Sequence, residues 1–449
     1  MSRHVVIIGN GIAGITAARH IRKLSDHEIT VVSAETDHFF SRTALMYVYM
    51  GHMSFEDTKP YEDWFWDKNR IRLRRAYVER VDTAERRLEL SGGERLPYDV
   101  LIVASGSRSN RFGWPGQDLQ GVQGLYSYPD LQLMEENTED VRRAVIVGGG
   151  LIGVETAEML LSRDIQVSFL VRERSWMDFA FPAPESEMIT RQIRAHGVDL
   201  RLSTELERIL PDDHGRVRAV VTKRGEEIAC EFVALTVGVS PNVEFLRDSG
   251  IECDRGVLVD EHLRTNVAEL YAVGDCAQLR RPLPGRQAVE PVWYVGRRMG
   301  ETVAQTICGE PTAYDQGIWF NSAKFFDLEW QTYGATAVEP SADVEILHWE
   351  HSAGKKSIRI DYRRDDGTVL GFNLMGVRYR HEICHEWIRD GRSIRFVLEN
   401  LGAANFDPEL FRQHEQDLID VYNTGHPGDP MKLRRRRGLG ALPAARRVS

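Results

Sequence analysis

Two glycine clusters have the spacing of a turn that binds phosphate groups. The first follows an apolar run at residues 4–8 and reads Gly-x-Gly-x-x-Gly, with its glycines at Gly9, Gly11 and Gly14. In such a turn the first glycine permits a tight bend, the second lets the backbone approach a pyrophosphate, and the third lets a helix pack closely on a strand. The N–H groups and dipole of the following helix then hold the anion. A single motif of this kind also occurs as a plain strand-to-helix connection.

An acidic residue stands where a dinucleotide site needs one. A second apolar run, at residues 28–34, ends at Glu35, about twenty residues beyond the glycines. A carboxylate there accepts hydrogen bonds from both hydroxyls of a ribose. We favour this role for Glu35 over that of a surface acid. The stretch predicts a strand, a turn, a helix and a second strand that bind a dinucleotide.

The second cluster repeats the first in the middle of the chain. An apolar run at residues 144–147 leads into glycines at the same three positions, Gly148, Gly150 and Gly153. Two such units in one chain are far more specific than one, because each lies between a strand and a helix. The economical interpretation is that the chain binds two dinucleotides, a resident redox cofactor and a diffusing nucleotide.

The second unit differs from the first at the ribose position. Its next strand, at residues 166–174, has Val171 where an NAD site would place an acid, and Arg172 and Arg174 stand beside it. A missing carboxylate with neighbouring arginines suits a 2′-phosphate, so we favour NADPH over NADH. Glu173 keeps NADH open as the alternative, because its carboxylate could swing in to bind a hydroxyl.

Three further predicted strands end in small or acidic residues that could approach a bound cofactor. One ends at Ala104 and Gly106 and another ends within residues 236–242, which are places where a chain passes close to a ligand or to another backbone. A third, at residues 270–273, ends at Gly274 and Asp275. We expect the carboxylate of Asp275 to bind a cofactor hydroxyl.

Changes in amino-acid composition and in hydrophobic pattern divide the chain into three domains and a tail. A Pro- and Gly-rich stretch at residues 113–116 marks a domain crossing, and from about residue 314 polar and apolar residues alternate as in an antiparallel sheet. The expected limits are a first dinucleotide domain at residues 1–115 and 245–313, a second at 116–244, a C-terminal α+β domain at 314–422 and a disordered tail at 423–449.

The composition is that of an ordinary globular protein. Of the 449 residues, 42% are hydrophobic and 28% are charged. No apolar run approaches the ~18 residues of a membrane-spanning helix, and the start does not look like a signal peptide, so we expect a cytoplasmic protein. The five cysteines never form Cys-x-x-Cys, which argues against a disulfide framework, a zinc ribbon or an iron–sulfur site. We interpret them as small buried side chains.

The charge is unevenly distributed along the chain. The net charge is −10, yet from Met431 onward there are seven cations and no acid, so the tail is basic and the body acidic. We expect a solvated tail and no nucleic-acid partner, with peripheral contact to anionic lipid, nucleic acid or an acidic protein as the alternative. Arg70, Arg72 and Arg74 alternate along one strand. We interpret them as a solvated face rather than a docking patch for an acidic electron carrier.

The order of these motifs resembles the pyridine nucleotide-disulfide oxidoreductase superfamily over about residues 4–335. Besides both glycine motifs and Glu35, the resemblance rests on Ala-Ser-Gly at 104–106, Val-Gly-Val-Ser-Pro-Asn at 237–242 and Tyr-Ala-Val-Gly-Asp at 271–275. The segments at 319–322 and 326–328 look like the third domain of the ferredoxin/rubredoxin reductase branch, which includes apoptosis-inducing factor.

The resemblance implies an α/β fold with two Rossmann-like dinucleotide-binding domains, for FAD and NAD(P), plus a C-terminal α+β interface domain. The residues that it implies for FAD are Gly9, Gly11, Gly14, Glu35, Arg42, Ala104, Gly106, Gly274 and Asp275. The residues that it implies for NAD(P)H are Gly148, Gly150, Gly153, Arg172 and Arg174. Glu155 matches the family's glutamate near the nicotinamide, and a hydride would pass from nicotinamide C4 to flavin N5.

The chain departs from the family beside the flavin. Disulfide reductases of the superfamily carry a redox cysteine on the segment that faces the flavin, whereas this chain has Thr43 there, so no thiol can relay electrons. Disulfide reduction is therefore disfavoured, and direct electron transfer to a partner is favoured. Members of this branch have a lysine near flavin N5, and its position corresponds to about Tyr47 in this chain. We therefore do not assign the usual contact to N5.

A short histidine motif near the C-terminus has an ordinary explanation. Residues 381–385 spell His-Glu-x-x-His, the helical arrangement of zinc metalloproteases. No third ligand is evident, so we assign no metal. We interpret His381 and His385 as exposed residues of a helix face, with a partner or subunit contact as the alternative.

Taken together, the residues and the resemblance predict a dimeric FAD-dependent NAD(P)H oxidoreductase. We expect it to pass electrons to a small redox protein such as a ferredoxin or rubredoxin, with Glu155, Tyr47 and Trp319 at the reaction centre. The first rival is a reductase of a small molecule such as a quinone, in which Tyr47, Trp293, Tyr294 and Trp319 would form an apolar pocket. A further alternative is a flavin-holding interaction protein whose redox state switches its assembly through the tail and the C-terminal domain.

Overall fold

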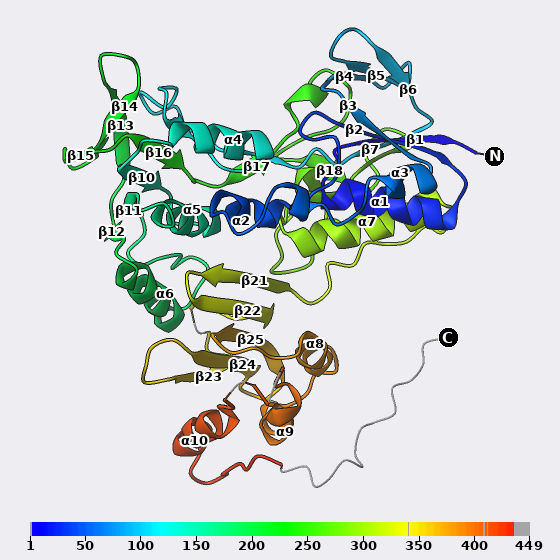
Figure 1. Cartoon of the computed structure of the whole chain (residues 1–449). Helices are drawn as coiled ribbons and strands as arrows, with labels where there is room; N and C mark the ends of the chain where they lie inside the picture. The colour runs from blue at the N-terminus through cyan, green and yellow to red at the C-terminus, as the bar shows by residue number, and fades with distance from the viewer. Residues whose placement is uncertain (1, 340, 407–408, 411, 435–449) are drawn as a thin grey trace. The chain divides into compact units, whose positions relative to one another are not determined.

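The computed structural model describes residues 2–339, 341–406, 409–410 and 412–434 (Figure 1). Its contacts divide the chain into two compact units. The first comprises Met1–Met177 and Ile193–Gly317, and the second comprises Asp178–Gln192 together with the described part of Ile318–Ser449. No helix in the described part of the chain is both long and apolar enough to span a bilayer.

The first unit begins with a five-stranded parallel sheet in the order β19-β7-β1-β2-β3. Its strands are β1 (His4–Ile8), β2 (Glu28–Ser33), β3 (Ile71–Arg75), β7 (Val100–Val103) and β19 (Leu270–Ala272). The helices of this domain are α1 (Ile12–Leu24), α2 (Leu45–Tyr49), α3 (Trp64–Lys68) and α7 (Trp293–Ile307). Ile8 lies beside Val32 and Val103, and Ala272 also lies beside Val103. The residues that follow these four strands therefore meet at one edge of the sheet.

A second parallel sheet in the same unit has the order β12-β11-β10-β16-β9. Its elements are β9 (Val122–Gln123), α4 (Tyr128–Asn137), β10 (Arg143–Val147), α5 (Leu151–Leu161), β11 (Gln166–Leu170), β12 (Asp199–Arg201) and β16 (Phe232–Leu235). The sequence starts α4 at a defined residue, because the side chain of Ser127 accepts from the Asp130 N–H while the Asp130 carboxylate accepts from the Ser127 N–H. The two parallel sheets confirm the predicted fold class.

Small antiparallel sheets complete the first unit. They are formed by β4 (Val78–Asp82), β5 (Arg87–Leu90) and β6 (Arg95–Pro97), and by β13 (Leu206–Pro211), β14 (Val217–Thr222) and β15 (Glu227–Ala229). A further parallel pair is β18 (Val257–Val259) with β20 (Ala277–Leu279). The chain leaves the first domain through β8 (Ser107–Ser109) and returns through β17 (Val239–Pro241), and these two strands pair with each other. The crossing between the domains is thus a short ribbon rather than two separate loops.

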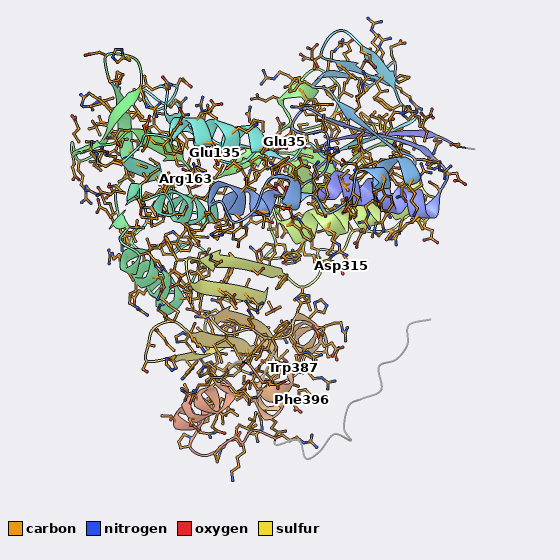
Figure 2. All side chains as sticks on the ribbon, in the orientation of Figure 1. Glu35, Glu135, Arg163, Asp315, Trp387 and Phe396 are labelled. Carbon is orange, nitrogen blue, oxygen red and sulfur yellow. The ribbon has the colours of Figure 1, made fainter. Side chains whose placement is uncertain are left out.

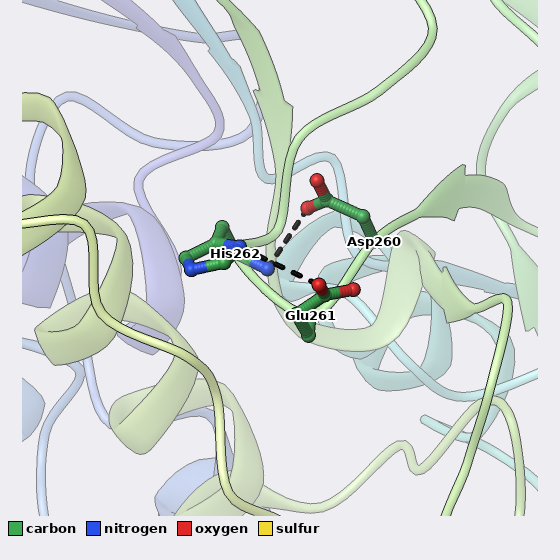
Figure 3. Close-up of side chains that lie close together, drawn as sticks. All are labelled: Asp260, Glu261 and His262. Carbon is green, nitrogen blue, oxygen red and sulfur yellow. Dashed lines mark hydrogen bonds and ion pairs between the residues drawn. The ribbon is translucent and has the colours of Figure 1, made fainter.

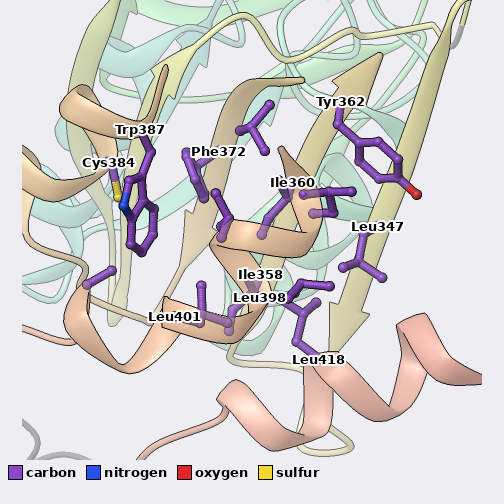
Figure 4. Packing of buried hydrophobic residues seen from close by; sticks show 14 of the residues in the cluster. Leu347, Ile358, Ile360, Tyr362, Phe372, Cys384, Trp387, Leu398, Leu401 and Leu418 are labelled. Atoms are coloured by element: carbon purple, nitrogen blue, oxygen red, sulfur yellow. The ribbon is translucent and has the colours of Figure 1, made fainter. Parts of the chain in front are cut away.

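The second unit is built on an antiparallel sheet in the order β21-β22-β25-β24-β23. Its strands are β21 (Phe320–Phe325), β22 (Leu328–Gly334), β23 (Val344–Glu350), β24 (Ser357–Arg363) and β25 (Val369–Met375), and its helices are α8 (His381–Arg389), α9 (Ile394–Asn400) and α10 (Glu415–Gly425). Side chains alternate along β24, so that Ile358 and Ile360 face a core shared with these helices (Figure 4). The expected alternation of polar and apolar residues is therefore the pattern of a sheet with one face in a core.

The opposite face of the same sheet holds a buried ion cluster. Arg359 donates from Nε to the Asp361 carboxylate at 2.7 Å, and its Nη1 lies 3.9 Å from the carboxylate of Glu185. Asn373 also donates to Glu185, at 3.2 Å. Glu185 belongs to α6 (Ala183–Ala195), and burial raises the pKa of its carboxyl. Because a buried carboxylate needs a compensating cation, the cluster fixes the start of α6 on this sheet.

These contacts differ from the expected domain limits. Residues 178–192 group with the C-terminal sheet, not with the second dinucleotide domain, and the first unit ends at Gly317. Residues 423–434 were expected to be disordered, but Met431 is buried and its N–H and C=O both bond to the side chain of Asn423. Most of the basic tail lies beyond residue 434, outside the described residues.

Candidate functional site

A cavity of about 620 Å³ lies within the first unit and is lined by both dinucleotide domains. The first domain contributes the residues that follow β1, β2, β7 and β19, and the second contributes one side of α5. The predicted site residues that line it are Gly9, Gly11, Glu35, Arg42, Ala104, Gly106, Glu155, Gly274 and Asp275. The fold thus brings together residues that are up to 266 positions apart in the printed sequence.

The first glycine turn has no room for side chains at two of its positions. A Cβ on Gly9 would overlap the carbonyl oxygen of Ala104, and its φ of +108° lies in the left-handed region that favours glycine. A Cβ on Gly14 would overlap the carbonyl oxygen of Gly9. A Cβ on Gly11, in contrast, would meet no atom within 4 Å. Open space therefore lies directly in front of the N-terminus of α1, where a pyrophosphate fits.

Asn10, which the sequence reasoning missed, ties this turn to the end of β2. Its amide nitrogen donates to the Thr36 and His38 carbonyl oxygens, at 3.0 and 3.1 Å, and its amide oxygen accepts from the Ser33 hydroxyl at 3.0 Å. The x positions of a Gly-x-Gly-x-x-Gly pattern carry no requirement of their own, so the motif gave no signal for Asn10. Its bonds hold the glycine turn beside the segment that carries Glu35.

Glu35 and Arg42 form a bidentate ion pair in the wall of the cavity. The two Nη atoms of Arg42 donate to the two carboxylate oxygens of Glu35 at 2.8 and 2.6 Å. The N–H of Tyr128 also donates to Glu35, at 2.8 Å. A carboxylate has about four acceptor positions, so Glu35 keeps capacity for a ribose hydroxyl. Both side chains are only partly exposed, and the pairing fixes their orientation.

Asp275 is held on another side of the cavity by two hydroxyl groups. Its carboxylate accepts from Tyr126 at 3.2 Å and from Ser107 at 3.3 Å. Burial raises the pKa of the Asp275 carboxyl, although these two hydrogen bonds oppose the shift. Tyr126 was not predicted, because it lies in the connection that enters the second domain and belongs to no motif. Its ring also lies 4.6 Å from the Arg42 guanidinium, so it links the two predicted FAD ligands Arg42 and Asp275.

The second glycine turn repeats the geometry of the first. Gly148 has a φ of +109°, and its Cβ would lie 2.6 Å from the Thr236 carbonyl oxygen. A Cβ on Gly153 would lie 2.5 Å from the Gly148 carbonyl oxygen. Gly150 is the N-cap of α5, and the nearest neighbour of its Cβ is 4.0 Å away. The N-terminus of α5 therefore also faces space that suits a pyrophosphate.

The predicted nucleotide-selecting residues lie just beyond β11. Val171 is fully buried and cannot bind a ribose hydroxyl. The side chain of Arg172 is 77% exposed and donates to Glu173 at 2.7 Å, whereas Glu173 is 15% exposed. Arg174 is exposed as well. The arginine side chains are therefore accessible to a phosphate group, and Glu173 is held by Arg172.

Glu155 projects from α5 into the cavity. Burial raises the pKa of its carboxyl to about 7, and the nearby Glu158 carboxylate adds to the shift. Burial and the like charge of Glu158 both disfavour the ionised form of this carboxyl. Glu155 thus changes its protonation state near neutral pH at the place where the two domains share a cavity.

A segment of eight residues, 42–49, contributes side chains to the wall of the cavity and is called the strap below. It consists of a 3-10 turn, Arg42–Ala44, followed by α2, and its residues Thr43, Leu45 and Met46 line the cavity. Tyr47 is not among the described residues that line the cavity, whereas its neighbour Met46 is. The role of Tyr47 at the reaction centre stays a prediction.

No cysteine lines the cavity in the part of the chain that the structure describes. Cys230, Cys276 and Cys384 are buried, as expected, whereas Cys253 is exposed. Burial raises the pKa of Cys276 to about 11 and that of Cys230 to about 12, so neither forms a reactive thiolate at neutral pH.

The predicted aromatic residues are not gathered at the cavity. Trp293 lines it from the first turn of α7, and its ring packs against that of Tyr294 at 5.4 Å. Tyr294 is 38% exposed and does not line the cavity among the described residues. Trp319 belongs to the second unit, immediately before β21. Its role at the reaction centre stays a prediction.

Two groups of potential metal ligands lie outside the cavity. Asp260, Glu261 and His262 come together in a turn (Figure 3), where the Asp260 carboxylate accepts from the backbone N–H of His262 and of Arg264 at 2.8 Å. This carboxylate stabilises its own turn. His381 and His385 lie on α8 with their ring centroids 5.8 Å apart. The ring of His381 packs edge-on against Phe320 at 4.4 Å, which gives it a packing role.

Comparison with known proteins agrees with this geometry. A family model described as pyridine nucleotide-disulphide oxidoreductase matches residues 3–300. The chain is 30% identical over 380 residues to rhodocoxin reductase of Rhodococcus erythropolis, which covers 83% of this chain and 85% of that protein. It is also 30% identical over 333 residues to an NAD(P)H nitrite reductase of Bacillus subtilis, covering 73% of this chain but only 40% of that protein. The chain thus spans less than half of the length of that relative.

A solved structure shares the fold. A ferredoxin reductase from Rhodopseudomonas palustris superposes with a TM-score of 0.75 at 22% identity, covering 83% of this chain and 91% of that chain. At this identity the likeness shows the fold alone.

The glycine turn allows a test that separates folding from dinucleotide binding. We expect Gly11→Ala to fold normally, because its Cβ meets no protein atom, and to lose about tenfold in flavin affinity, because the methyl group enters the phosphate space. Gly14→Ala is expected to unfold at a lower temperature, because its Cβ overlaps the Gly9 carbonyl oxygen. Thermal unfolding and the flavin-to-protein absorbance ratio measure the two effects. Full flavin affinity in a folded Gly11→Ala protein would contradict the assignment.

Proposed function

Because the chain belongs to the pyridine nucleotide-disulphide oxidoreductase family, we propose that it is an FAD-dependent NAD(P)H oxidoreductase that passes electrons to a small redox protein of the ferredoxin or rubredoxin type. The observation that carries this proposal is the cavity itself. Both dinucleotide domains line it, it contains Glu155, and none of its described lining residues is a cysteine.

The residues around the cavity fit the two groups that the family binds. Glu35, Arg42 and Asp275 surround the space before α1, where they would bind the ribose and phosphates of FAD. The N-terminus of α5 would hold the pyrophosphate of NAD(P)H. FAD held there would supply the chemistry of accepting a hydride from a nicotinamide and of releasing electrons one at a time. In its neutral form Glu155 places no negative charge against the flavin as it is reduced.

No described residue that lines the cavity carries a thiol, and this supports one acceptor class over another. A disulfide or persulfide substrate of this fold needs a reactive cysteine beside the flavin, and the strap supplies Thr43, Leu45 and Met46 instead. Rhodocoxin reductase, 30% identical over 83% of this chain, is named for a protein acceptor. Both observations support direct transfer to a redox protein. The quinone alternative is weaker, because of its four expected aromatic residues only Trp293 lines the cavity among the described residues.

Arg70, which immediately precedes β3, and Arg72 and Arg74 of β3 do not form a free cationic patch. Arg70 pairs with Asp26 at 2.6 Å, Arg72 pairs with Glu28 at 2.9 Å, and Arg74 pairs with Glu94. Neutralised cations on an exposed strand fit the interpretation of a solvated face. A homodimer and a cytoplasmic location stay part of the proposal.

Anaerobic stopped-flow measurement of the two half-reactions tests the function. We expect NADPH or NADH to bleach the flavin, and the reduced protein to be reoxidised quickly by a ferredoxin or rubredoxin but slowly by disulfides. A quinone is included among the acceptors, because it distinguishes this function from that of a small-molecule reductase. Fast reoxidation by the quinone alone would replace the proposed acceptor, and bleaching without reoxidation by any acceptor would favour the redox-switched interaction protein.

Arg172 tests the preference for NADPH. Because Val171 offers no ribose acceptor and Arg172 is exposed beside it, Arg172→Ala should weaken NADPH binding about tenfold and leave NADH binding unchanged. Glu173→Gln serves as the matched control, since it frees Arg172 from its ion pair and keeps the arginine. Unchanged kinetics with NADPH in Arg172→Ala would remove the 2′-phosphate assignment.

The pH dependence of flavin reduction tests Glu155. Its pKa is raised to about 7, so the carboxyl is neutral below that pH and negative above it. The rate of flavin reduction should fall about tenfold as pH rises through 7, because the carboxylate opposes the negative charge that arrives with the hydride. In Glu155→Gln the rate of flavin reduction should be high and should not change with pH across this range. Glu158→Gln should move the inflection to lower pH, since it removes a like charge. The same inflection in Glu155→Gln would show that another group titrates.

A further inference from the structure

The strap is anchored at both ends, and the two anchors come from different domains. At its start, Arg42 is paired with Glu35 of the first domain. At its end, Tyr49 is 1% exposed and contacts the second domain, where its hydroxyl lies 2.7 Å from the Thr138 hydroxyl at the end of α4. Between these anchors lie the side chains that line the cavity. The position of the strap over the cavity is therefore set in part by the second domain.

Arg163 supplies the strongest part of the second anchor. Its Nη2 and Nε donate to the carbonyl oxygen of Tyr49 at 2.6 and 3.2 Å, and its guanidinium carbon lies 3.5 Å from the centre of the Tyr49 ring. The same Nη2 pairs with Glu135 of α4 at 2.7 Å. Figure 2 labels Glu135 on α4 and Arg163 beside the end of α5. One guanidinium thus joins α2, α4 and the end of α5.

Arg163 is connected through α5 to the nucleotide site. Gly150 caps the N-terminus of α5, Glu155 projects from its middle into the cavity, and Arg163 follows its end, with its N–H bonded to the carbonyl oxygen of Leu160. The helix has 11 residues, which is about 16 Å at 1.5 Å per residue. A helix of this length is rigid, so a displacement at its N-terminus reaches its other end.

We propose that Arg163 is a positioning residue that couples nucleotide binding at α5 to the strap over the flavin cavity. Its bonds keep α2 at a fixed distance from α5. When a nucleotide binds at the N-terminus of α5, the strap therefore takes a defined position relative to the nucleotide side of the cavity. This inference rests on the proposed function, because it requires a nucleotide at the N-terminus of α5. Residues 42–49 contain no cysteine, so the strap cannot relay electrons through a thiol. Its contribution to the reaction is the packing of its side chains at the cavity.

Hydrogen exchange of the strap tests the coupling without using activity. The amides of Met50, Gly51 and His52 bond to the carbonyl oxygens of Met46, Val48 and Tyr47, and so they report whether α2 is formed. In the flavin-loaded wild-type protein, NADP⁺ should slow their exchange about fivefold or more. In Arg163→Ala this slowing should disappear, while slowing at residues 150–155 persists because the nucleotide still binds. Nucleotide-dependent slowing of the strap in Arg163→Ala would overturn the coupling, and so would slowing at 150–155 without any at the strap in the wild type.

Variants of Arg163 should change the rate of flavin reduction much more than the affinity for the nucleotide. Arg163→Ala should slow flavin reduction at saturating nucleotide about tenfold and change the nucleotide Kd less than about threefold. Arg163→Lys, which keeps the charge opposite Glu135 but loses the stacked planar group, should recover part of the rate. Arg218→Ala is the matched control, because Arg218 forms an exposed ion pair with Glu227 at 2.7 Å on the small sheet of the second domain. A fall in flavin reduction rate that Arg218→Ala reproduces would overturn the proposal.

A milder variant covers the case in which Arg163→Ala does not fold. Glu135→Gln removes the ion pair but leaves the bonds from Arg163 to Tyr49. It should weaken the nucleotide-dependent protection of the strap about twofold, and full protection would overturn the role of the ion pair. If NADP⁺ slows exchange nowhere in the wild-type protein, the measurement is repeated with NAD⁺. If neither nucleotide slows exchange, the nucleotide site itself fails, which is a failure of the proposed function and distinct from failure of the coupling.

Discussion

The whole site depends on a place where two pieces of backbone touch with no side chain between them. At the end of β1 a Cβ on Gly9 would overlap the carbonyl oxygen of Ala104 at the end of β7, and a Cβ on Gly14 would overlap Gly9. This contact lets α1 start directly over the edge of the sheet, so that its free N–H groups face the cavity. The second domain uses the same device, with Gly148 against Thr236 and Gly153 against Gly148. Both helices can start at these places because only glycine fits at these crossings.

Polar groups at this edge are held by one another. Glu35 follows β2, Asp275 follows β19, and parallel strands bring their carboxyl ends to the same edge of a sheet. Arg42 pairs with Glu35, and Tyr126 contacts both Arg42 and Asp275. A partly buried carboxylate without such partners would be costly or would take up a proton. The network therefore keeps two acceptors in place before any cofactor arrives, which is the preorganisation that a tightly held dinucleotide requires.

Glu155 and the strap give the cavity its chemical character. The cavity side of α5 carries the Glu155 carboxyl, whose pKa is raised to about 7, and the strap lines the cavity with the side chains of Thr43, Leu45 and Met46. None of these groups can store an electron pair for a disulfide substrate. Under the proposed function, electrons that enter this site would therefore leave from the flavin itself. Arg163, which follows α5, bonds to Tyr49 at the end of the strap and to Glu135 of α4, so it connects the two walls.

The sequence alone determined the local chemistry of the chain. The glycine spacing at 9–14 and 148–153, the acid at Glu35 and the strand ends at Ala104 and Gly274 each follow from a local requirement, and a local requirement leaves a readable pattern. The fold class and the family followed from the order of these patterns. The alternation of apolar residues also predicted the C-terminal sheet, because a sheet with one face in a core has a period of two.

Only the tertiary structure decided which of these residues share a cavity. Asn10, Tyr126 and Arg163 occupy positions that no motif constrains, and each acts through partners that are distant in the sequence. A helix turns by about 100° per residue, and among the described residues Met46 lines the cavity whereas Tyr47 does not, a difference that the sequence pattern did not indicate. Residues 178–192 follow a strand of the second domain, yet the buried charges of Glu185 and Arg359 draw them to the C-terminal sheet. Local patterns specify backbone conformation, whereas the pairing of buried charges is settled only when distant segments pack together.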